Sequence, residues 1–230
     1  MKIIAVHLGD NLMQTDISKL ISFVSETRKK QIKRFIREKD QCSSLIGELM
    51  VRRYLEIKLR MDSKNLTFNY NKYGKPFLKH INNFQFNISH SGDWVVCAFD
   101  KKPIGVDIER VTSVDLCIAK KFFSKKEYYQ LLQKNPKEKL SSFFKYWTAK
   151  ESYIKAIGKG LSMPLNSFYA AIHKEKIVFH SFENNDKWFG KIFNIDLAYK
   201  LSICSRTNLF PEQVSILQDK EIYKYFTIKE

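Results

Sequence analysis

Residues 94–110 of the chain read WVVCAFDKKPIGVDIER. The runs 94–99 and 104–108 are rich in β-branched and aromatic residues, and this composition favours two strands. Between them, the DKKP sequence at 100–103 is typical of a turn, so the segment predicts a β-hairpin. It lies near the middle of the 230-residue chain, and helical patterns occur on both sides of it.

The order of patterns before this segment repeats after it. Helical spacing of apolar residues covers most of 17–59, and strand-like alternation follows up to residue 108. Helical patterns then cover about 113–157, and four or five strands follow between 167 and 204. Helices followed by strands, twice, predict an α+β fold made of two halves of similar build, which we divide into 1–104 and 105–230.

The chain is strongly basic, with 40 Lys and Arg against 24 Asp and Glu and a formal net charge of +16. Such a charge suggests nucleic acid, a membrane surface, a phosphate-bearing ligand or an acidic protein as partner. One basic cluster lies in 26–39, where Ile32, Phe35 and Ile36 form an apolar stripe, so a helix with one basic face is expected there.

Several classes of protein are disfavoured by what the chain lacks. It has no apolar run long enough to span a membrane and no signal peptide, so we expect a cytoplasmic protein. Its four cysteines form no Cys-x-x-Cys pair and its five histidines no His-x-x-x-His pair. Buried free thiols are therefore expected, and neither a disulfide framework nor a transition-metal enzyme is indicated.

Two carboxylates fall on one side of the second predicted strand. In GVDIE at 105–109, Asp107 and Glu109 point to one face, while Val106 and Ile108 point to the other. Neighbouring carboxylates repel each other unless they are solvated or bridged by a cation. The pentapeptide alone therefore fits either a solvated strand face or half of a cation site.

A third carboxylate lies on the helix predicted at 138–157. Trp147, Glu151 and Lys155 are spaced to stack along one side of it, and the GKG sequence at 158–160 ends it. Glu151 and Lys155 fit an ordinary surface ion pair. Alternatively, Glu151 joins Asp107 and Glu109 around Mg²⁺, which prefers oxygen ligands, and Lys155 faces the phosphates of a substrate.

A further polar motif is NISHSG at 87–92. It predicts a strand that ends in a polar turn, where Ser89 and His90 are exposed. Taken singly, each of these motifs also fits an ordinary structural role.

Together, the motifs resemble those of the 4′-phosphopantetheinyl transferases of the surfactin-synthetase-activating type. The resemblance rests on NISHS at 87–91, GVDIE at 105–109, FFS at 122–124 and WTAKESYIK at 147–155, in that order, and YGKP at 73–76 and GKGL at 158–161 match as well. It implies two α+β halves related by a pseudo-twofold axis, with coenzyme A in the cleft between them. It also implies transfer of phosphopantetheine from coenzyme A to a serine of an acyl or peptidyl carrier protein, releasing adenosine 3′,5′-bisphosphate.

The resemblance also implies roles for individual residues. Asp107, Glu109 and Glu151 would hold Mg²⁺, and Lys155 would contact the diphosphate of the coenzyme, with Glu151 and Lys155 in catalytic roles. The cofactor-binding positions would be Tyr73, Gly74, Lys75 and Pro76 for the adenine, with Arg28, Ser44, Ser89 and His90 around the 3′-phosphate and the diphosphate.

Two positions leave alternatives open. By resemblance, Glu127 is a candidate general base for the carrier serine, yet SKKE at 124–127 also fits a capping box, in which Glu127 bonds the backbone at a helix start. Position 31 is Gln, where relatives often carry a basic residue, so Lys30 or Lys33 would replace the contact to the 3′-phosphate or it would be lost.

The expected partners are coenzyme A and an acidic, helical carrier protein, with no nucleic acid and no membrane. The carrier would dock against the second half near Phe122 and Phe123 and the segment after Gly160. A monomer is expected, because both sides of the cleft lie in one chain. A basic nucleic-acid-binding module and an inactive paralogue are the competing hypotheses. The first leaves the three carboxylates without a role, and the intact carboxylates and Lys155 argue against the second.

Overall fold

The computed structural model of the chain describes residues 1–9, 17–62, 66–78, 81, 83–182 and 186–228. None of the helices in these ranges combines the length and the hydrophobicity that a membrane span requires.

The first half packs a long helix against a four-stranded sheet. Its elements are β1 (Lys2–His7), α2 (Ile17–Leu20), the 3-10 turn η1 (Ile21–Phe23), α3 (Glu26–Ile32), α4 (Glu38–Leu59), β2 (Phe68–Tyr70), β3 (Pro76–Leu78), β4 (Gln85–Ser91), β5 (Trp94–Asp100), β11 (Ser215–Gln218) and α8 (Asp219–Thr227). The sheet has the order β11-β1-β5-β4, and β2 and β3 form a separate two-stranded ribbon. Leu45, Ile46 and Leu49 on α4 are fully buried in the core of this half.

The second half repeats this plan with a five-stranded antiparallel sheet. Its elements are β6 (Ile104–Arg110), α5 (Ile118–Phe122), α6 (Lys125–Leu132), α7 (Pro136–Ile157), the 3-10 turns η3 (Gly160–Ser162) and η4 (Leu165–Ser167), β7 (Phe168–His173), β8 (Lys176–Ser181), β9 (Trp188–Phe193) and β10 (Tyr199–Ser205). The strand order is β6-β10-β9-β8-β7. The long helices α4 and α7 each have 22 residues.

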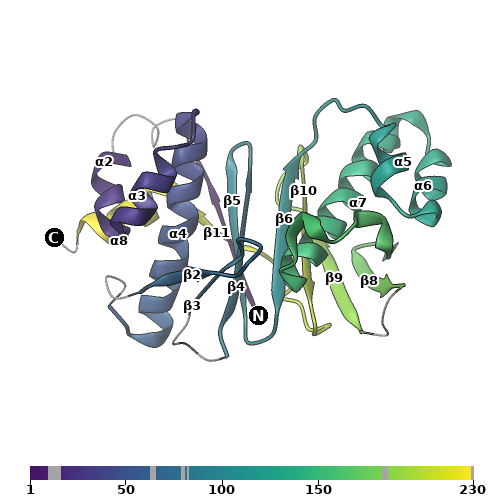
Figure 1. Cartoon of the computed structure of the whole chain (residues 1–230). Coiled ribbons are helices and arrows are strands. Elements are labelled where there is room, and N and C mark those ends of the chain that lie inside the picture. Colours follow the sequence, from purple (N-terminus) through teal and green to yellow (C-terminus); the bar gives the residue numbers. More distant parts are fainter. Residues whose placement is uncertain (10–16, 63–65, 79–80, 82, 183–185, 229–230) are drawn as a thin grey trace.

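The two sheets face each other in the middle of the molecule, with α4 outside one and α7 outside the other (Figure 1). A shared apolar core fills the space between them: Ile3, Val96 and Ala98 of the first sheet pack with Val106 and Ile203 of the second. The predicted α+β fold is therefore confirmed. The alternation predicted for 105–109 also holds, because Val106 and Ile108 lie in this core.

The predicted hairpin at 94–108 is wrong. β5 already pairs with β1 on one edge and β4 on the other, so it has no edge left for β6. β6 pairs with β10 instead. The turn at 100–103 thus carries the chain from one sheet to the facing one.

Two other expectations differ from the structure. The basic helix predicted at 26–39 ends at Ile32, because Phe35 and Ile36 face solvent and give a longer helix no apolar face to bury. All four cysteines are free thiols, as expected, but Cys117 is exposed while the other three are buried.

The C-terminal segment returns to the first half. β11 pairs in parallel with β1, and Ile222 and Phe226 of α8 are buried in the first core. Residues 215–227 therefore lie with the first half, whereas the predicted division at 104/105 assigns them to the second. That division remains a prediction.

Candidate active site

A glycine allows the first strand of the second half to touch its long helix. A Cβ atom on Gly105 would lie only 2.0 Å from the carbonyl oxygen of Ser152 and 2.4 Å from the nitrogen of Ala156. Any other residue would therefore push β6 away from α7. Because side chains alternate along a strand, Asp107 points to the same helix as Gly105 does.

Three elements meet at Asp107. Its Oδ1 accepts hydrogen bonds from Nζ of Lys155 at 2.6 Å and from Oγ of Ser89 at 3.1 Å. Nζ of Lys155 also donates to Oγ of Ser89 at 3.0 Å. The structure thus brings together the predicted residues of β4, β6 and α7.

The NISHS motif has a second task that the sequence did not indicate. Side chains of Asn87, Ser89 and Ser91 accept hydrogen bonds from the backbone N–H groups of Val106, Ile108 and Arg110. They satisfy the edge of β6 that pairs with no strand in the described part of the chain, and so join the two halves. The polar turn expected here is instead part of strand β4.

The three predicted metal ligands are close enough to repel one another. Burial, as the largest cause, raises the pKa of each of the carboxyl groups of Asp107, Glu109 and Glu151, and their mutual repulsion raises the pKa values of Glu109 and Glu151 further. Oγ of Ser91 donates to Oε2 of Glu109 at 2.8 Å.

The chemistry of these carboxylates fits a divalent cation, although their side chains do not surround a single point. Oδ2 of Asp107 is buried and has no hydrogen-bond partner among the described residues, which leaves it for a cation to contact. Across the described parts of the chain, however, no three His, Cys, Asp or Glu side chains are already gathered as a metal-binding group. The donor set is the all-oxygen set that Mg²⁺ prefers, so the residues fit the ion.

Beside these groups, a pocket of about 230 Å³ opens between α3, α4, β2, β3 and β4. Arg28 lines it, and its guanidinium donates to Oε2 of Glu48 at 2.9 Å and to Oγ of Ser44 at 2.7 Å. Gln31 accepts from the same guanidinium at 3.4 Å. The pocket is lined by Arg28, Ser44, Glu48, Phe68, Tyr70, Pro76, Phe86, Asn87, Ile88 and His90.

His90 lies at the rim of this pocket. Its side chain is exposed, yet desolvation by the surrounding walls lowers the pKa of the imidazole, and the positive charges of Lys155 and Arg28 lower it further. A neutral imidazole can donate one hydrogen bond to a phosphate oxygen.

The first three residues of the predicted adenine-binding segment, 73–75, lie in the connection between β2 and β3, and Pro76 begins β3. Gly74 has φ +85°, a left-handed conformation that suits glycine. Pro76 lines the pocket, whereas the amine of Lys75 points to the end of α7. Tyr73 is exposed. The side chain of Lys75 therefore does not face the pocket.

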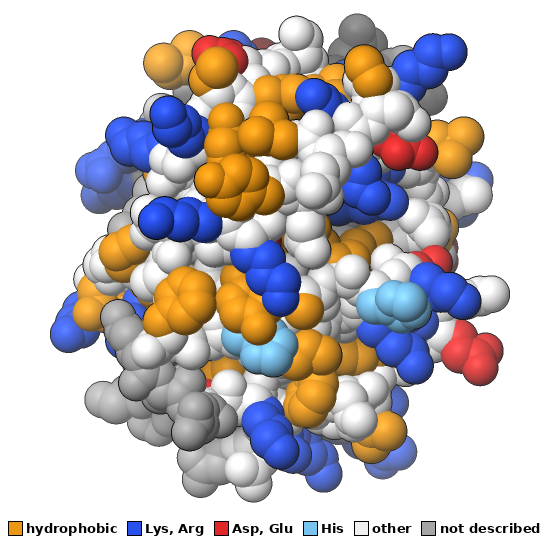
Figure 2. Space-filling view, turned by 90° about the vertical axis from the view of Figure 1, so that its right-hand side faces the viewer, with side chains coloured by type: hydrophobic (Ala, Val, Ile, Leu, Met, Phe, Trp, Pro, Cys, Tyr) orange, Lys and Arg blue, Asp and Glu red, His pale blue; other side chains and the backbone are white. Residues whose placement is uncertain are grey.

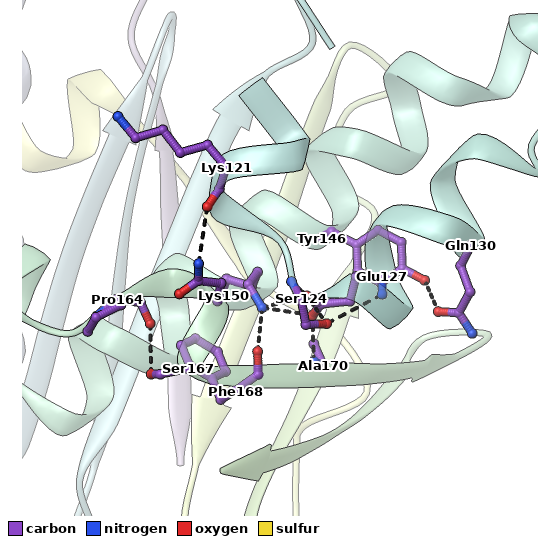
Figure 3. Close-up of polar contacts among 11 residues, drawn as sticks. Lys121, Ser124, Glu127, Gln130, Tyr146, Lys150, Pro164, Ser167, Phe168 and Ala170 are labelled. Carbon is purple, nitrogen blue, oxygen red and sulfur yellow. Dashed lines mark hydrogen bonds and ion pairs between the residues drawn. The ribbon is translucent and has the colours of Figure 1, made fainter. Parts of the chain in front are cut away.

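Glu127 forms the predicted capping box with Ser124 at the start of α6. Its carboxylate is fully buried and also accepts from Nζ of Lys150 at 2.7 and 2.8 Å and from the backbone N–H of Ala170 at 2.7 Å (Figure 3). These contacts favour the structural interpretation, and the general-base role stays a prediction.

Lys150 is a residue that the sequence reasoning missed. It is fully buried, donates to the carbonyl of Phe168 at 2.8 Å, and lies on the face of α7 opposite to solvent. In the sequence, Lys150 stands between Ala149 and the charged Glu151. Nothing in these neighbours distinguishes it from an ordinary surface lysine.

The arrangement defines a class of site. A partly exposed lysine and an arginine-lined pocket can hold phosphate groups, and three carboxylates beside them can hold a cation against the same phosphates. Enzymes that transfer phosphoryl groups rely on this positioning and charge neutralisation.

Comparisons with known proteins give the family. A family model described as "4'-phosphopantetheinyl transferase, N-terminal" matches residues 11–102, and one described as "4'-phosphopantetheinyl transferase superfamily" matches residues 103–204. The 4'-phosphopantetheinyl transferase Sfp of Bacillus subtilis (strain 168) is 36% identical over 223 residues, which are 96% of this chain and 100% of that protein. The 4'-phosphopantetheinyl transferase gsp of Aneurinibacillus migulanus is 41% identical over 213 residues, 90% of this chain and 87% of its own.

The chain therefore belongs to the 4′-phosphopantetheinyl transferase family and is an enzyme of that class. Sfp-type and gsp-type members match it over most of its length. The two family models meet between residues 102 and 103.

Proposed function

We propose that the chain transfers 4′-phosphopantetheine from coenzyme A to a serine of an acyl or peptidyl carrier protein. The observation that supports this most is the meeting of Lys155, Asp107 and Ser89 at 2.6–3.1 Å, where Asp107 keeps a buried oxygen that no described residue hydrogen-bonds. A lysine next to such an oxygen suits a diphosphate bridged to a cation.

The coenzyme would lie along the seam between the halves. Its adenine would contact the backbone of 73–76, and its 3′-phosphate would face Arg28, Ser44 and His90. Glu48 forms ion pairs with both Arg28 and Arg52. One carboxylate between two guanidinium groups leaves one net positive charge, which a phosphate would neutralise. Lys155, 30% exposed, would contact the diphosphate.

Asp107, Glu109 and Glu151 would hold Mg²⁺. When bound, the ion would neutralise charge on the diphosphate oxygens. It would also remove the repulsion that raises the pKa values of Glu109 and Glu151.

In the transfer, the hydroxyl oxygen of the carrier serine forms a bond to the phosphorus that carries the pantetheine. The bond from that phosphorus to the oxygen of the leaving bisphosphate breaks, and Lys155 stabilises the charge that develops there. The proton of the serine must leave, and we assign Glu151 to accept it through a carboxylate oxygen that the ion leaves free, because this residue is half-buried and one turn before Lys155. Glu127, enclosed by Lys150 and Ser124, would instead keep α7 in place.

The carrier would approach the second half near α5. Phe123 is buried there and Phe122 half-buried, so the neighbouring lysines rather than Phe123 would contact it. Figure 2 shows the outer face of this half, where Lys and Arg side chains surround hydrophobic ones and acidic side chains are sparse. This face suits an acidic carrier.

We also propose that the protein is a cytoplasmic monomer.

The test is direct transfer. The chain is incubated with coenzyme A, Mg²⁺ and an apo carrier protein, and the molecular mass of the carrier is then measured by mass spectrometry. We expect a mass gain of one phosphopantetheine, and none on a carrier whose serine is replaced by alanine. No gain with fatty-acid, polyketide and peptide-synthetase carriers, together with tight DNA binding, would overturn the proposal in favour of a nucleic-acid-binding module.

A further inference from the structure

The connection between β2 and β3 is attached to the far half of the molecule. Oδ1 of Asn71 accepts hydrogen bonds from the backbone N–H groups of Tyr73 and Lys75, both at 2.9 Å, and so shapes the turn. Its Nδ2 donates to the carbonyl of Gly158 at 2.8 Å. One side chain therefore shapes the loop and also binds it to the end of α7.

Lys75 makes the second attachment. Its Nζ donates to the carbonyl of Ala156 at 3.2 Å and to the carbonyl of Ile104 at 3.1 Å. Ala156 lies in the last turn of α7, and Ile104 is the first residue of β6. The amine therefore joins a first-half loop to the two elements that carry the candidate site.

The chemistry of a helix end accounts for this contact. The last carbonyls of a helix have no intrahelical partner, and a cation near them is favoured by the helix dipole. Gly158 leaves room for the loop, since a Cβ atom there would lie 3.1 Å from Cδ of Lys75 and 3.2 Å from Nδ2 of Asn71.

The two carbonyls lie close along the chain to the site. Ala156 directly follows Lys155, and Ile104 lies on β6 three positions before Asp107. Burial lowers the pKa of Lys75 to about 8, so keeping the amine charged at this position costs free energy. An exposed lysine would avoid that cost.

We propose that Lys75 is a positioning residue for the transfer: its amine ties the loop whose backbone meets the nucleotide to the ends of β6 and α7, and so aligns the bound coenzyme with Asp107 and Lys155. The inference rests on the proposed function and assigns to this side chain a role other than contact with the adenine. Binding at 73–76 would then stabilise the C-terminal turn of α7.

The experiment compares the full chain with Lys75→Met, which keeps the apolar stem and removes the amine. Lys102→Met, at an exposed lysine in the turn before β6, is the matched control. Steady-state kinetics with coenzyme A and an apo carrier give kcat and KM, and the melting temperature reports stability. Amide hydrogen exchange with and without coenzyme A reports the end of α7, where the N–H of Gly158 bonds the carbonyl of Ile154.

We expect Lys75→Met to lower kcat/KM for coenzyme A by about 10- to 100-fold through both kcat and KM, because misalignment of reacting groups costs rate. In the unchanged chain coenzyme A should slow exchange at Gly158, and in Lys75→Met this slowing should be lost. Lys102→Met should match the unchanged chain.

Two results would overturn the inference. One is a Lys75→Met protein with a lower melting temperature but unchanged kcat and KM, which would make the amine a helix cap and nothing more. The other result needs no variant: the unchanged chain transfers phosphopantetheine, but the rate of amide hydrogen exchange at Gly158 is the same with and without coenzyme A. A chain that neither binds coenzyme A nor transfers would instead refute the proposed function, and the inference with it.

Discussion

Nζ of Lys155 lies 2.6 Å from Oδ1 of Asp107, and the two side chains differ sharply in exposure, at 30% and 5%. The pair therefore has a buried anionic end and a cationic end that is partly exposed to solvent. Because α7 supplies one partner and β6 the other, the orientation of Lys155 depends on the close approach that Gly105 allows.

The first prediction concerns the charge of Asp107. Asp107→Asn keeps the shape of the side chain and an oxygen for Ser89, but removes the anion that Lys155 and a cation both need. We expect the initial rate of phosphopantetheine transfer, followed by mass spectrometry, to fall by at least about 100-fold, with little change in melting temperature. Asp115→Asn, at an exposed carboxylate, is the control. Normal transfer by Asp107→Asn would remove the assignment of this residue to the site.

The second prediction concerns the cation. Chelation by EDTA should stop transfer, and Mg²⁺ should stabilise the protein because the folded state alone gathers the carboxylates. At about 100 times the dissociation constant, the free energy of unfolding should rise by about 2.7 kcal/mol. Thermal unfolding with and without Mg²⁺ measures this.

Glu151→Gln provides the specificity check for that effect, since it removes one proposed ligand. The Mg²⁺-dependent rise in stability should shrink or disappear in this variant. An equal rise in both proteins would place the binding site elsewhere.

Local patterns predicted much of what lies around the site. Alternation placed Val106 and Ile108 in the core and left Asp107 on the other face. The glycine stop was also correct, because Gly158 ends α7 with φ +78°. These features depend on neighbours within a few residues, which a sequence shows directly.

Features that depend on distant partners were not predictable in this way. Strand pattern alone does not say which edge a strand will pair, so the turn after β5 looked like a hairpin. The parallel pairing of β11 with β1 joins the two ends of the chain, and Ile4 is opposite Ser215. Likewise, nothing local to Lys75 or Lys150 indicates the carbonyls and the carboxylate that hold them.

The third prediction separates the two interpretations of Glu127. Glu127→Gln leaves the buried ammonium of Lys150 without its counter-charge, and loss of one partner of such a pair costs about 3–5 kcal/mol. The free energy of unfolding, measured in urea, should fall by that amount.

The double variant Glu127→Gln with Lys150→Met decides the matter. Removing both charges should restore most of the stability, because no unpaired ion remains. If Glu127 is structural, this variant should transfer phosphopantetheine within about tenfold of the unchanged chain, a small effect beside the 10²–10⁴ of a lost general base. A stable double variant without activity would make Glu127 the base.

The fourth prediction concerns pH. Burial lowers the pKa of Lys75 from its ordinary 10.5 to about 8, against a smaller opposing effect of Cys204. Between these two values the unfolded chain binds more protons than the folded one at this residue. The contribution of Lys75 to stability therefore rises with pH across this window and is constant below it.

Comparison with Lys75→Met isolates this effect from that of Lys150, whose pKa burial also lowers to about 8. The difference in unfolding free energy between the two proteins should grow in favour of the unchanged chain as the pH rises through the window. Lys102→Met should show no such trend. A difference that stays flat with pH would mean that Lys75 titrates at its ordinary value.

The last prediction concerns the net charge of +16. If the basic outer face of the second half steers an acidic carrier, added salt should screen that attraction, because the Debye length falls from about 10 Å at 0.1 M to about 3 Å at 1 M. Steering acts on encounter more than on chemistry, so kcat/KM for the carrier should fall with salt while kcat stays nearly constant. Steady-state kinetics at low and high salt, with the coenzyme saturating, measure both. A kcat/KM for the carrier that does not respond to salt would mean that the positive charge serves the coenzyme site and not the encounter with the carrier.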